Sequence, residues 1–304
     1  MAVTATMVKE LREMTGAGMM DCKKALVEAD GDQDKAVEIL REKGLSKAAK
    51  KAGRIAAEGL VKVAFAEDGK AAAIIEVNSE TDFVAKNEDF VDFVTKLAEM
   101  VLAGDYANMD EFMAAEYGDE GTVQEVLTNR IATIGENLTI RRFEKVAADG
   151  TAYAGYIHGG GKIGVVVGIE TEASADEIQV VGKDVAMQVA SMNPKFLDDT
   201  EVDHDWLESE KKIAREQLLN EGKPEAMLDK IIPGKVKALL KEVCLVNQKF
   251  VKDGDVTVEQ YVDSVAKEAG KPMKVAKMIR FEVGEGIEKK QEDFAAEVAA
   301  QMNK

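Results

Sequence analysis

Two aspartates in residues 79–90, SETDFVAKNEDF, have side chains suited to acid–base chemistry or to cation binding. Asp82 and Asp89 could act as a general acid and base, or their oxygens could ligate a divalent cation in a metal-assisted hydrolase. No histidine, cysteine or glycine-rich loop adjoins them, and no pattern fixes their separation. The apolar residues Phe83 and Val84 lie beside Asp82 instead. The segment follows the strand-like run AAAIIEVN, where an active-site loop could lie, but it lacks the residues of an active site.

A glycine-rich stretch, GGGKIG at residues 159–164, satisfies the G-x-G-x-x-G pattern of dinucleotide sites. In such sites the glycines open a helix whose N-terminal amides face phosphate. Here the strand-like VVVGIE follows, so the sequence predicts a hairpin turn. No G-x-x-x-x-G-K-[ST] phosphate loop occurs, and no G-x-S-x-G nucleophile elbow accompanies HGGG. We therefore expect no bound nucleotide or other cofactor.

The two histidines and two cysteines do not form a ligand set. Cys22 and Cys244 are far apart and are expected to be small buried apolar residues. His204 is expected at the surface, whereas the His158 imidazole could either cap the glycine turn or point toward a partner. We expect no metal site and no catalytic residues, and hence a protein that is not an enzyme.

Charge is unevenly distributed along the 304 residues. The chain has 40 Lys and Arg against 57 Asp and Glu, a net charge of −17. Residues 1–54 hold 11 basic and 9 acidic side chains, so the negative excess belongs to the rest of the chain. An acidic surface repels phosphate backbones, so direct DNA binding is not expected. The basic run SKAAKKAGR, residues 46–54, could touch RNA or an acidic partner, but a solvated helix or linker is the simpler interpretation.

The composition, with 46% hydrophobic and 32% charged residues, is typical of a soluble globular protein. No apolar stretch approaches the roughly 18 residues needed to span a bilayer, and MAVTATMVKELRE lacks the apolar core of a signal peptide. We expect a cytoplasmic protein of more than one domain and no membrane partner.

Residues 1–55 are expected to form an N-terminal docking domain of three short helices. Apolar residues at helical spacing mark the first helix, TGAG interrupts it, and a second apolar set from Met19 to Val27 marks the next. DGDQ supplies the start of the third helix and Gly44 its end. Such a bundle resembles ubiquitin-associated domains, which dock partners and do not catalyse reactions.

Two pairs of segments indicate an internal duplication. Residues 58–76 and 154–170 both run from a glycine into a β-rich stretch, turn at Gly-Lys and leave through an apolar strand. Residues 122–144 and 257–282 both pass from a helix through a glycine into a strand that ends in Arg-Phe-Glu or Arg-Arg-Phe-Glu. We infer two copies of a hairpin, helix, helix, strand unit, and predict an α+β fold. The predicted half-domains are residues 56–148, and residues 149–198 together with 244–284.

The second copy is interrupted by residues 199–243, which are predicted to form an antiparallel helical hairpin, or coiled coil. Two apolar stripes at helical spacing are separated by NEGKP. A hairpin of this kind has little core of its own, which makes it a candidate surface for homodimerisation. The alternative is that it folds back on its own body.

Asn87 divides residues 79–90 into two parts. It is a good N-cap for a helix whose apolar stripe begins at Phe90. Phe83 and Val84 lie upstream of that stripe, and TEASADEI, at the matching place of the second copy, has no aromatic residue. One interpretation is an exposed apolar tip, and the other is that Phe83 is buried in its own half-domain.

Five motifs occur along the chain in the order in which a known family has them. They are VKELREMTGAGMMDCKKALVEADGD (8–32), EVNSETDFVAKNEDF (76–90), IGENLTIRR (134–142), HGGGKIGV (158–165) and IRFEVGEGIEK (279–289). Together they closely resemble the bacterial elongation factor Ts family. The insertion resembles the coiled-coil dimerisation module that some members of this family carry.

The resemblance implies a guanine-nucleotide exchange factor for elongation factor Tu, the GTPase that delivers aminoacyl-tRNA to the ribosome. It implies that residues 81–84 press against the GDP-bound GTPase and dislocate its Mg²⁺, which belongs to the partner. Phe83 would act as an apolar wedge between helices and Asp82 would make polar contacts beside it. The residues implied in this dislocation are Thr81, Asp82, Phe83 and Val84, and the further implied partner contacts are Arg12, Met19, Met20, Lys23, Ile134, Gly135 and His158.

The resemblance also assigns residues 285–304 to a C-terminal module, whose helix at residues 293–300 would add to the same interface. It allows a homodimer within a two-plus-two complex with the GTPase. The competing interpretation is a non-catalytic adaptor that uses its N-terminal ubiquitin-associated-like bundle, with the α+β body as a spacer.

Overall fold

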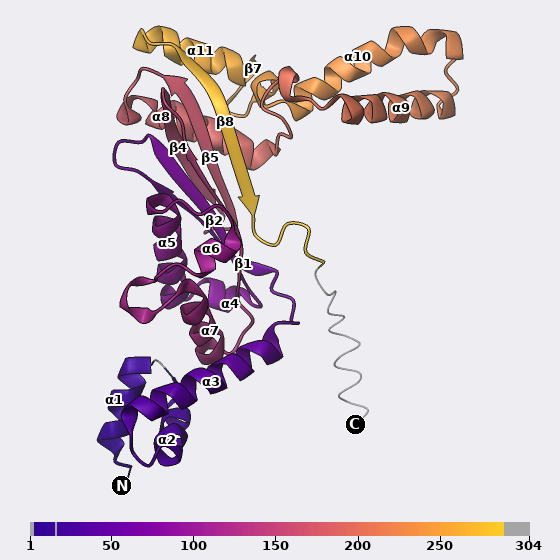
Figure 1. The fold of residues 1–304 in the computed structure, drawn as a ribbon. Helices are drawn as coiled ribbons and strands as arrows, with labels where there is room; N and C mark the ends of the chain where they lie inside the picture. The colour runs from indigo at the N-terminus through magenta and orange to yellow at the C-terminus, as the bar shows by residue number, and fades with distance from the viewer. Residues whose placement is uncertain (1–2, 16, 289–304) are drawn as a thin grey trace.

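The computed structural model describes residues 3–15 and 17–288. Figure 1 shows a helical bundle near the N-terminus, a central body of sheets and helices, and a long helical hairpin that leaves the body at its other end. The described part is a mixed α+β fold, as predicted. Within it, no helix combines the length and the hydropathy that a membrane span requires.

Three helices form the N-terminal bundle. They are α1 (Ala5–Thr15), α2 (Met19–Glu28) and α3 (Gln33–Lys51). They meet in a small apolar core that includes the fully buried Leu11, Cys22 and Leu26. The helix α3 begins where the sequence predicts, because the Asp32 carboxylate accepts a hydrogen bond from the Lys35 amide and caps the helix.

The prediction that Gly44 ends the third helix is wrong. The helix α3 continues for about two further turns, to Lys51. Gly44 is buried in its middle, where a Cβ atom would lie 3.6 Å from the Cβ of Ala132 on α7 (Val123–Ile134). The glycine therefore allows two helices to approach closely, and α3 joins the bundle to the body.

The first half-domain is a three-stranded antiparallel sheet with helices packed on it. Its strands β1 (Glu58–Phe65), β2 (Ala71–Ser79) and β3 (Thr139–Ala147) pair in the order β1-β2-β3. The helices α5 (Glu88–Ala103) and α7 share one apolar core with this sheet. Short elements connect them, namely α4 (Asp82–Ala85), α6 (Met109–Met113) and the 3-10 turn η1 (Gly118–Glu120).

The second half-domain repeats this arrangement. Its strands β4 (Thr151–His158), β5 (Ile163–Thr171) and β8 (Met273–Glu282) pair in the order β4-β5-β8. The helices α8 (Ala175–Met192) and α11 (Val258–Ala269) pack on them. The hydrophobic pattern does not predict the small elements beside the insertion, which are β6 (Lys249–Phe250), β7 (Asp253–Thr257), η2 (Asp199–Glu201) and η3 (Leu245–Asn247).

The two half-domains agree in local detail. The helices α7 and α11 each begin with a threonine capping box, at Thr122 and Thr257. Each ends at a glycine in the left-handed conformation, Gly135 and Gly270. The β2–β3 and β5–β8 ladders each carry a register shift at matching places. These shared features support the duplication inferred from the sequence.

The two sheets pack face to face between their helices. Ile74 on β2 joins Tyr153 and Val166 of the other sheet in an apolar layer, whereas the adjacent Ile75 faces the core formed with α5 and α7. Both faces of β2 are therefore buried. This explains why AAAIIEV is apolar at almost every position instead of alternating.

A buried carboxylate joins the half-domains close to the end of β8. Glu76 on β2 is fully buried and accepts hydrogen bonds from Arg141 at 3.0 Å and Arg142 at 2.6 Å. The backbone amide of Gly284, which follows β8, donates to the same carboxylate at 2.8 Å. Arg142 also pairs with Glu285 at 3.1 Å. The buried charge is thus fully partnered, as a buried carboxylate requires.

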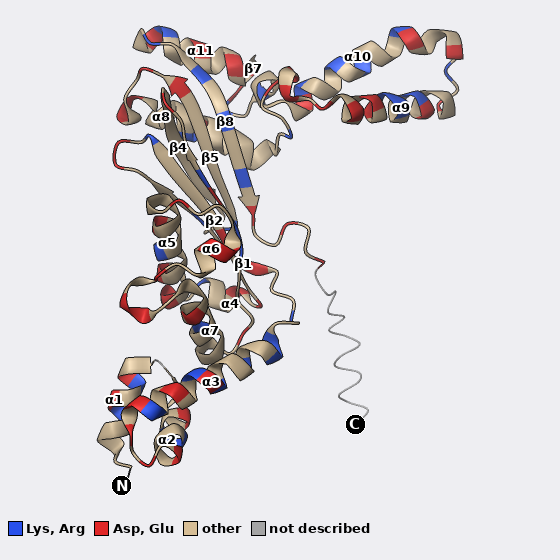
Figure 2. Cartoon of the chain, in the orientation of Figure 1, with Lys and Arg blue, Asp and Glu red and all other residues tan. Residues whose placement is uncertain are grey.

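The insertion forms α9 (His204–Asn220) and α10 (Glu225–Val243), an antiparallel hairpin that extends away from the body (Figure 1). Its helices contact each other, and α10 contacts η3 at the base. The alternative in which the hairpin folds back on its own body is therefore wrong. In Figure 2, acidic and basic residues are marked along both of its helices.

Candidate functional site

Phe83 is the most exposed large apolar side chain of the described residues, with 82% of its surface accessible. It lies on α4, a single helical turn between β2 and α5. The Thr81 hydroxyl begins this turn by accepting a hydrogen bond from the Val84 amide at 3.4 Å. Asn87 caps α5 as predicted, because its side-chain oxygen accepts from the Asp89 amide at 2.9 Å. The alternative in which Phe83 is buried in its own half-domain is wrong.

The residues around Phe83 hold the turn against the body. Val84 is half-buried against the first apolar core, and Ala85 is buried within it. The four residues predicted as one tip therefore differ in environment. Phe83 projects, whereas Thr81 and Val84 are held.

Thr81 is held by a carboxylate that the sequence analysis did not nominate. Glu136, just after α7, accepts a hydrogen bond from the Thr81 hydroxyl at 2.7 Å and another from the Thr81 amide at 3.0 Å. A parallel contact lies beside it, where the Asn137 amide donates to Glu80 at 2.6 Å and Arg54 pairs with Glu80 at 3.5 Å. No local sequence pattern predicts the first contact, because Thr81 and Glu136 are 55 residues apart.

Asp82 pairs with Lys86 on the same turn, at 2.5 Å. This hydrogen bond holds the pKa of the Asp82 carboxyl below its usual range, and the positive charge of Lys162 adds to the effect. Among the described residues, no group of three or more His, Cys, Asp or Glu side chains is placed to hold a metal ion.

The glycine turn of the second half-domain lies next to α4. As predicted, GGGKIG forms a hairpin turn, between the end of β4 at His158 and the start of β5 at Ile163. The Gly161 carbonyl accepts a hydrogen bond from the Val61 amide on β1 at 2.7 Å. Strand β1 also contacts α4, and the positive charge of Lys162 also lowers the pKa of Asp82. The glycine turn of the second half-domain and the α4 turn of the first therefore lie on the same part of the surface.

His158 is exposed at this turn. Its Nδ1 atom lies 3.1 Å from the Tyr156 hydroxyl, while its backbone carbonyl accepts from the Gly161 and Lys162 amides to close the turn. The imidazole therefore does not cap the hairpin. Contact of the exposed imidazole with a partner, the second of the two alternatives, stays a prediction.

Ile134 and Gly135 end α7 directly before Glu136. Ile134 is half-buried against the first core, and Gly135 has a φ of 88°, a left-handed conformation that turns the chain toward Thr81. The Gly135 carbonyl accepts a hydrogen bond from Lys51 of α3. The structure thus brings these two predicted contact residues next to α4, with the bundle attached to them through α3.

The bundle residues implied by the resemblance are at its surface. Met19 and Met20 are 57% and 61% exposed, and Arg12 and Lys23 are also exposed. Met14 and Val27 are also exposed apolar residues of the bundle. Val27 belongs to the apolar set that marks the second helix in the sequence. An exposed apolar set on a small domain is typical of a protein-binding surface.

The basic run at residues 46–54 is largely used within the chain. Lys47 pairs with Asp21 at 2.7 Å, Lys51 donates to a backbone carbonyl, and Arg54 pairs with Glu80. Three basic side chains of the run therefore have partners within the chain. The interpretation as part of a helix is confirmed up to Lys51.

Three other predictions about single residues agree with the structure. Cys22 and Cys244 are buried and free, and burial raises the pKa of the Cys244 thiol to about 12. His204 is exposed, at the start of α9. The helix predicted at residues 293–300 lies outside the described residues.

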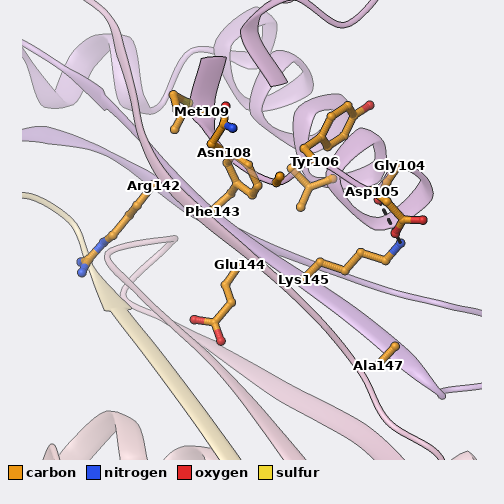
Figure 3. A pocket seen from close by; sticks show the side chains of 12 residues that line it. Gly104, Asp105, Tyr106, Asn108, Met109, Arg142, Phe143, Glu144, Lys145 and Ala147 are labelled. Atoms are coloured by element: carbon orange, nitrogen blue, oxygen red, sulfur yellow. Dashed lines mark hydrogen bonds and ion pairs between the residues drawn. The ribbon is translucent and has the colours of Figure 1, made fainter. Parts of the chain in front are cut away.

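A groove beside β3 has a volume of about 690 Å³ and is shown in Figure 3. Tyr106, Phe143 and Met109 supply apolar surface, and Lys145 pairs with Asp105 across one side at 2.7 Å. None of the predicted site residues lines it. The candidate site is therefore the surface around α4, not this groove.

The fold and the site define a class of protein: a duplicated α+β body with an N-terminal helical bundle, which exposes apolar side chains on the bundle and at α4. Comparison with known proteins identifies the family. Residues 80–285 match the family model described as elongation factor TS. The chain belongs to the elongation factor Ts family.

Several characterised relatives match over nearly the whole chain. Elongation factor Ts of Clostridioides difficile is 57% identical over 300 residues, which cover 99% of both chains. Elongation factor Ts of Clostridium novyi is 54% identical over 303 residues, again 99% of both. That of Clostridium botulinum is 53% identical over 302 residues, 99% of this chain and 100% of the relative.

Proposed function

We propose that this chain is a translation elongation factor that binds elongation factor Tu in its GDP form and promotes exchange of GDP for GTP. The observation that carries this proposal is Phe83, an aromatic side chain 82% exposed on a turn whose flanking residues are held by the body. Family membership supports the role in translation. The place of action is then the cytoplasm, where ribosomes work.

In this proposal the chain acts by binding and is not an enzyme. Phe83 inserts as an apolar wedge beside the nucleotide site of the GTPase, and Asp82 makes polar contacts next to it. The Mg²⁺ that is dislocated belongs to the partner. Thr81 and Val84 keep Phe83 in place, and the exposed imidazole of His158 meets the same partner from the second half-domain.

The bundle supplies a second contact with the partner in this proposal. Met19 and Met20 add apolar surface, and Arg12 and Lys23 add charge. Ile134 and Gly135 lie between the two contacts, because Lys51 of α3 binds the Gly135 carbonyl and Glu136 binds Thr81. Contacts from the bundle and from α4 can thus act on the GTPase together.

Magnitudes show why both contacts are needed. Burial of one phenylalanine is worth about 1.5–3 kcal/mol, and each tenfold change in rate takes about 1.4 kcal/mol. Phe83 alone could therefore accelerate GDP release by about ten- to a hundredfold. A larger acceleration needs binding energy from the bundle, used to hold the GTPase in a conformation of low nucleotide affinity.

Substitution of Phe83 by alanine tests the proposal. We expect Phe83→Ala to slow release of labelled GDP from elongation factor Tu by about ten- to a hundredfold, measured by stopped flow, with an unchanged circular dichroism spectrum. The matched control is Val180→Ala, because Val180 is 71% exposed on α8, away from the proposed contact. Equal release rates for Phe83→Ala and the unaltered chain would contradict the proposal.

The second candidate is an adaptor that binds partners through its bundle alone, which the exposed Met14, Met19 and Met20 favour. The two candidates differ in their response to nucleotide. Coupling between two ligands is reciprocal, so GDP must weaken an exchange factor's hold on its GTPase. In a pull-down from bacterial lysate, excess GDP should release the partner of an exchange factor and leave that of an adaptor bound.

A further inference from the structure

The turn that carries Phe83 cannot be stable by itself. The helix α4 has four residues, and one isolated helical turn is unfavourable because it fixes several dihedral angles for a single hydrogen bond. Its C-terminal side is anchored by the buried Ala85 and the half-buried Val84. Its N-terminal side is anchored at Thr81, where the Glu136 carboxylate binds the amide and the hydroxyl, and the Ser79 hydroxyl donates to the carbonyl at 2.9 Å.

The contact between Glu136 and Thr81 uses both carboxylate oxygens. Oε1 accepts from the Thr81 hydroxyl at 2.7 Å, and Oε2 accepts from the Thr81 amide at 3.0 Å. Two hydrogen bonds to one residue fix its orientation as well as its position. The same hydroxyl accepts from the Val84 amide, so the direction of the first helical turn depends on this pair.

The second half-domain uses the same position for a similar purpose. Lys271 follows the left-handed Gly270 as Glu136 follows Gly135, and its Nζ atom lies 2.7 Å from both oxygens of Glu177 in the first turn of α8. Here the helix has 18 residues and begins with Ala175. In both copies, the residue after the glycine therefore holds the start of the helix that follows the middle strand of the sheet, α4 after β2 and α8 after β5. Only the first copy has an exposed aromatic residue on that helix.

We propose that Glu136 is a positioning residue for nucleotide exchange, which holds the α4 turn so that Phe83 meets the GTPase in one orientation. The proposal rests on the exchange function proposed above. Without Glu136, the Thr81 hydroxyl and amide lose their acceptor, and the Ser79 hydroxyl, which donates to the Thr81 carbonyl at 2.9 Å, holds the residue at its carbonyl. Binding to the partner must then order the turn. The need for this ordering lowers the rate at which the GTPase in the complex releases GDP, while the contacts made by the bundle stay intact.

The test measures GDP release from elongation factor Tu at increasing concentrations of full-length variants. For Glu136→Ala we expect the maximal release rate to fall about tenfold, with the half-saturating concentration changed less than about twofold. Glu136→Gln keeps one acceptor oxygen and should lose less. A rise in the half-saturating concentration without a fall in the maximal rate would overturn the proposal, because it would make Glu136 a binding contact.

A double-mutant cycle separates positioning from other roles. If Glu136 acts through Phe83, Glu136→Ala should slow release by less than about twofold in a Phe83→Ala background. Equal losses in both backgrounds would overturn the proposal. If Phe83→Ala alone leaves release unchanged, the proposed exchange function fails, which is a separate result.

The matched control is Lys271→Ala, which removes the equivalent contact in the second half-domain. It should leave the maximal release rate unchanged, since the start of α8, at Ala175, does not contact the GTPase in the proposal. An equal loss of rate in Lys271→Ala and Glu136→Ala would show a general effect on folding and would also overturn it. If Glu136→Ala does not fold, Thr81→Val removes the hydroxyl's contacts with Glu136 and with the Val84 amide and keeps the amide contact with Glu136. It should show the same pattern, and an unchanged maximal rate would overturn the proposal.

Discussion

Two phenylalanines seven positions apart have opposite environments. Phe90 is fully buried on α5, whereas Phe83 is exposed on α4. Asn87 lies between them and starts a new helix, so the apolar stripe of α5 does not extend to Phe83. An exposed aromatic residue on a held turn has little value for folding. Its value lies in binding, which is why Phe83 carries the proposed function.

Glu177 gives a prediction for pH dependence. The hydrogen bonds from Lys271, and then those from Ser174, lower the pKa of its carboxyl from 4.5 to about 2. Since the pKa is lower in the folded than in the unfolded state, the ionised carboxylate stabilises the fold. That contribution should be complete above a pH of about 4.5 and lost as the pH falls toward about 2.

The measurement is a titration of the Glu177 side chain by NMR. In Lys271→Ala, the pKa of Glu177 should rise toward its ordinary value. The control Lys267→Ala removes an exposed lysine of α11, the helix that ends just before Lys271, and should leave the pKa unchanged. A Glu177 that titrates at the same pH with and without Lys271 would contradict the assignment.

The α9–α10 hairpin has a small core for its length. Only Leu218 and Leu228 of its described residues are fully buried, while Ile213, Leu219 and Met227 stay exposed. Exposed apolar residues on a projecting hairpin favour association with a second copy. We therefore propose that the hairpin forms a homodimer, within a two-plus-two complex with elongation factor Tu.

Removal of the hairpin tests this proposal at the level of the element. Residues 204–242 can be replaced by a short glycine–serine linker, because the pairing of Phe196 with Cys244 closes the base without them. We expect the variant to sediment as a monomer and to retain most of its exchange activity. The point variant Ile213→Glu should also weaken association. Sedimentation of the unaltered chain as a monomer would rule the homodimer out.

In the whole molecule, the two half-domains are joined by an apolar layer and by the buried carboxylate of Glu76. Removal of one partner of a buried ion pair costs about 3–5 kcal/mol. The side chains of Arg141 and Arg142 are 26% and 31% exposed, so water screens part of this penalty. We expect Glu76→Ala to lower the free energy of unfolding by about 2–3 kcal/mol.

Urea denaturation followed by circular dichroism would measure this change. The control is Glu144→Ala, which removes a second ion pair between the half-domains, with Lys277 at 3.1 Å. Because both of its side chains are about 40–46% exposed, the control should cost at most about 1 kcal/mol. A cost for Glu76→Ala no greater than that of the control would mean that the buried carboxylate stabilises the fold no more than an exposed ion pair does.

Much of the fold can be predicted from the sequence because its signals are local. The stripe that begins at Phe90, the cap at Asn87 and the glycine turn after His158 each depend on residues within a few positions of one another. A prediction from local residues is wrong at Gly44, where the sequence predicts a helix end and the helix continues. There the requirement for glycine comes from Ala132 on another helix, which no local pattern contains.

The sequence by itself determines the longer helices and strands, the duplication and the family, because periodicity, caps and motifs are properties of short segments. Only the tertiary structure decides that Phe83 projects, that the hairpin extends from the body, and that Glu136 holds Thr81. These facts depend on which distant segments the folded chain brings together. Glu136 lies 55 residues from Thr81, and Arg141 lies 65 residues from Glu76, so these contacts exist only once the first half-domain has formed.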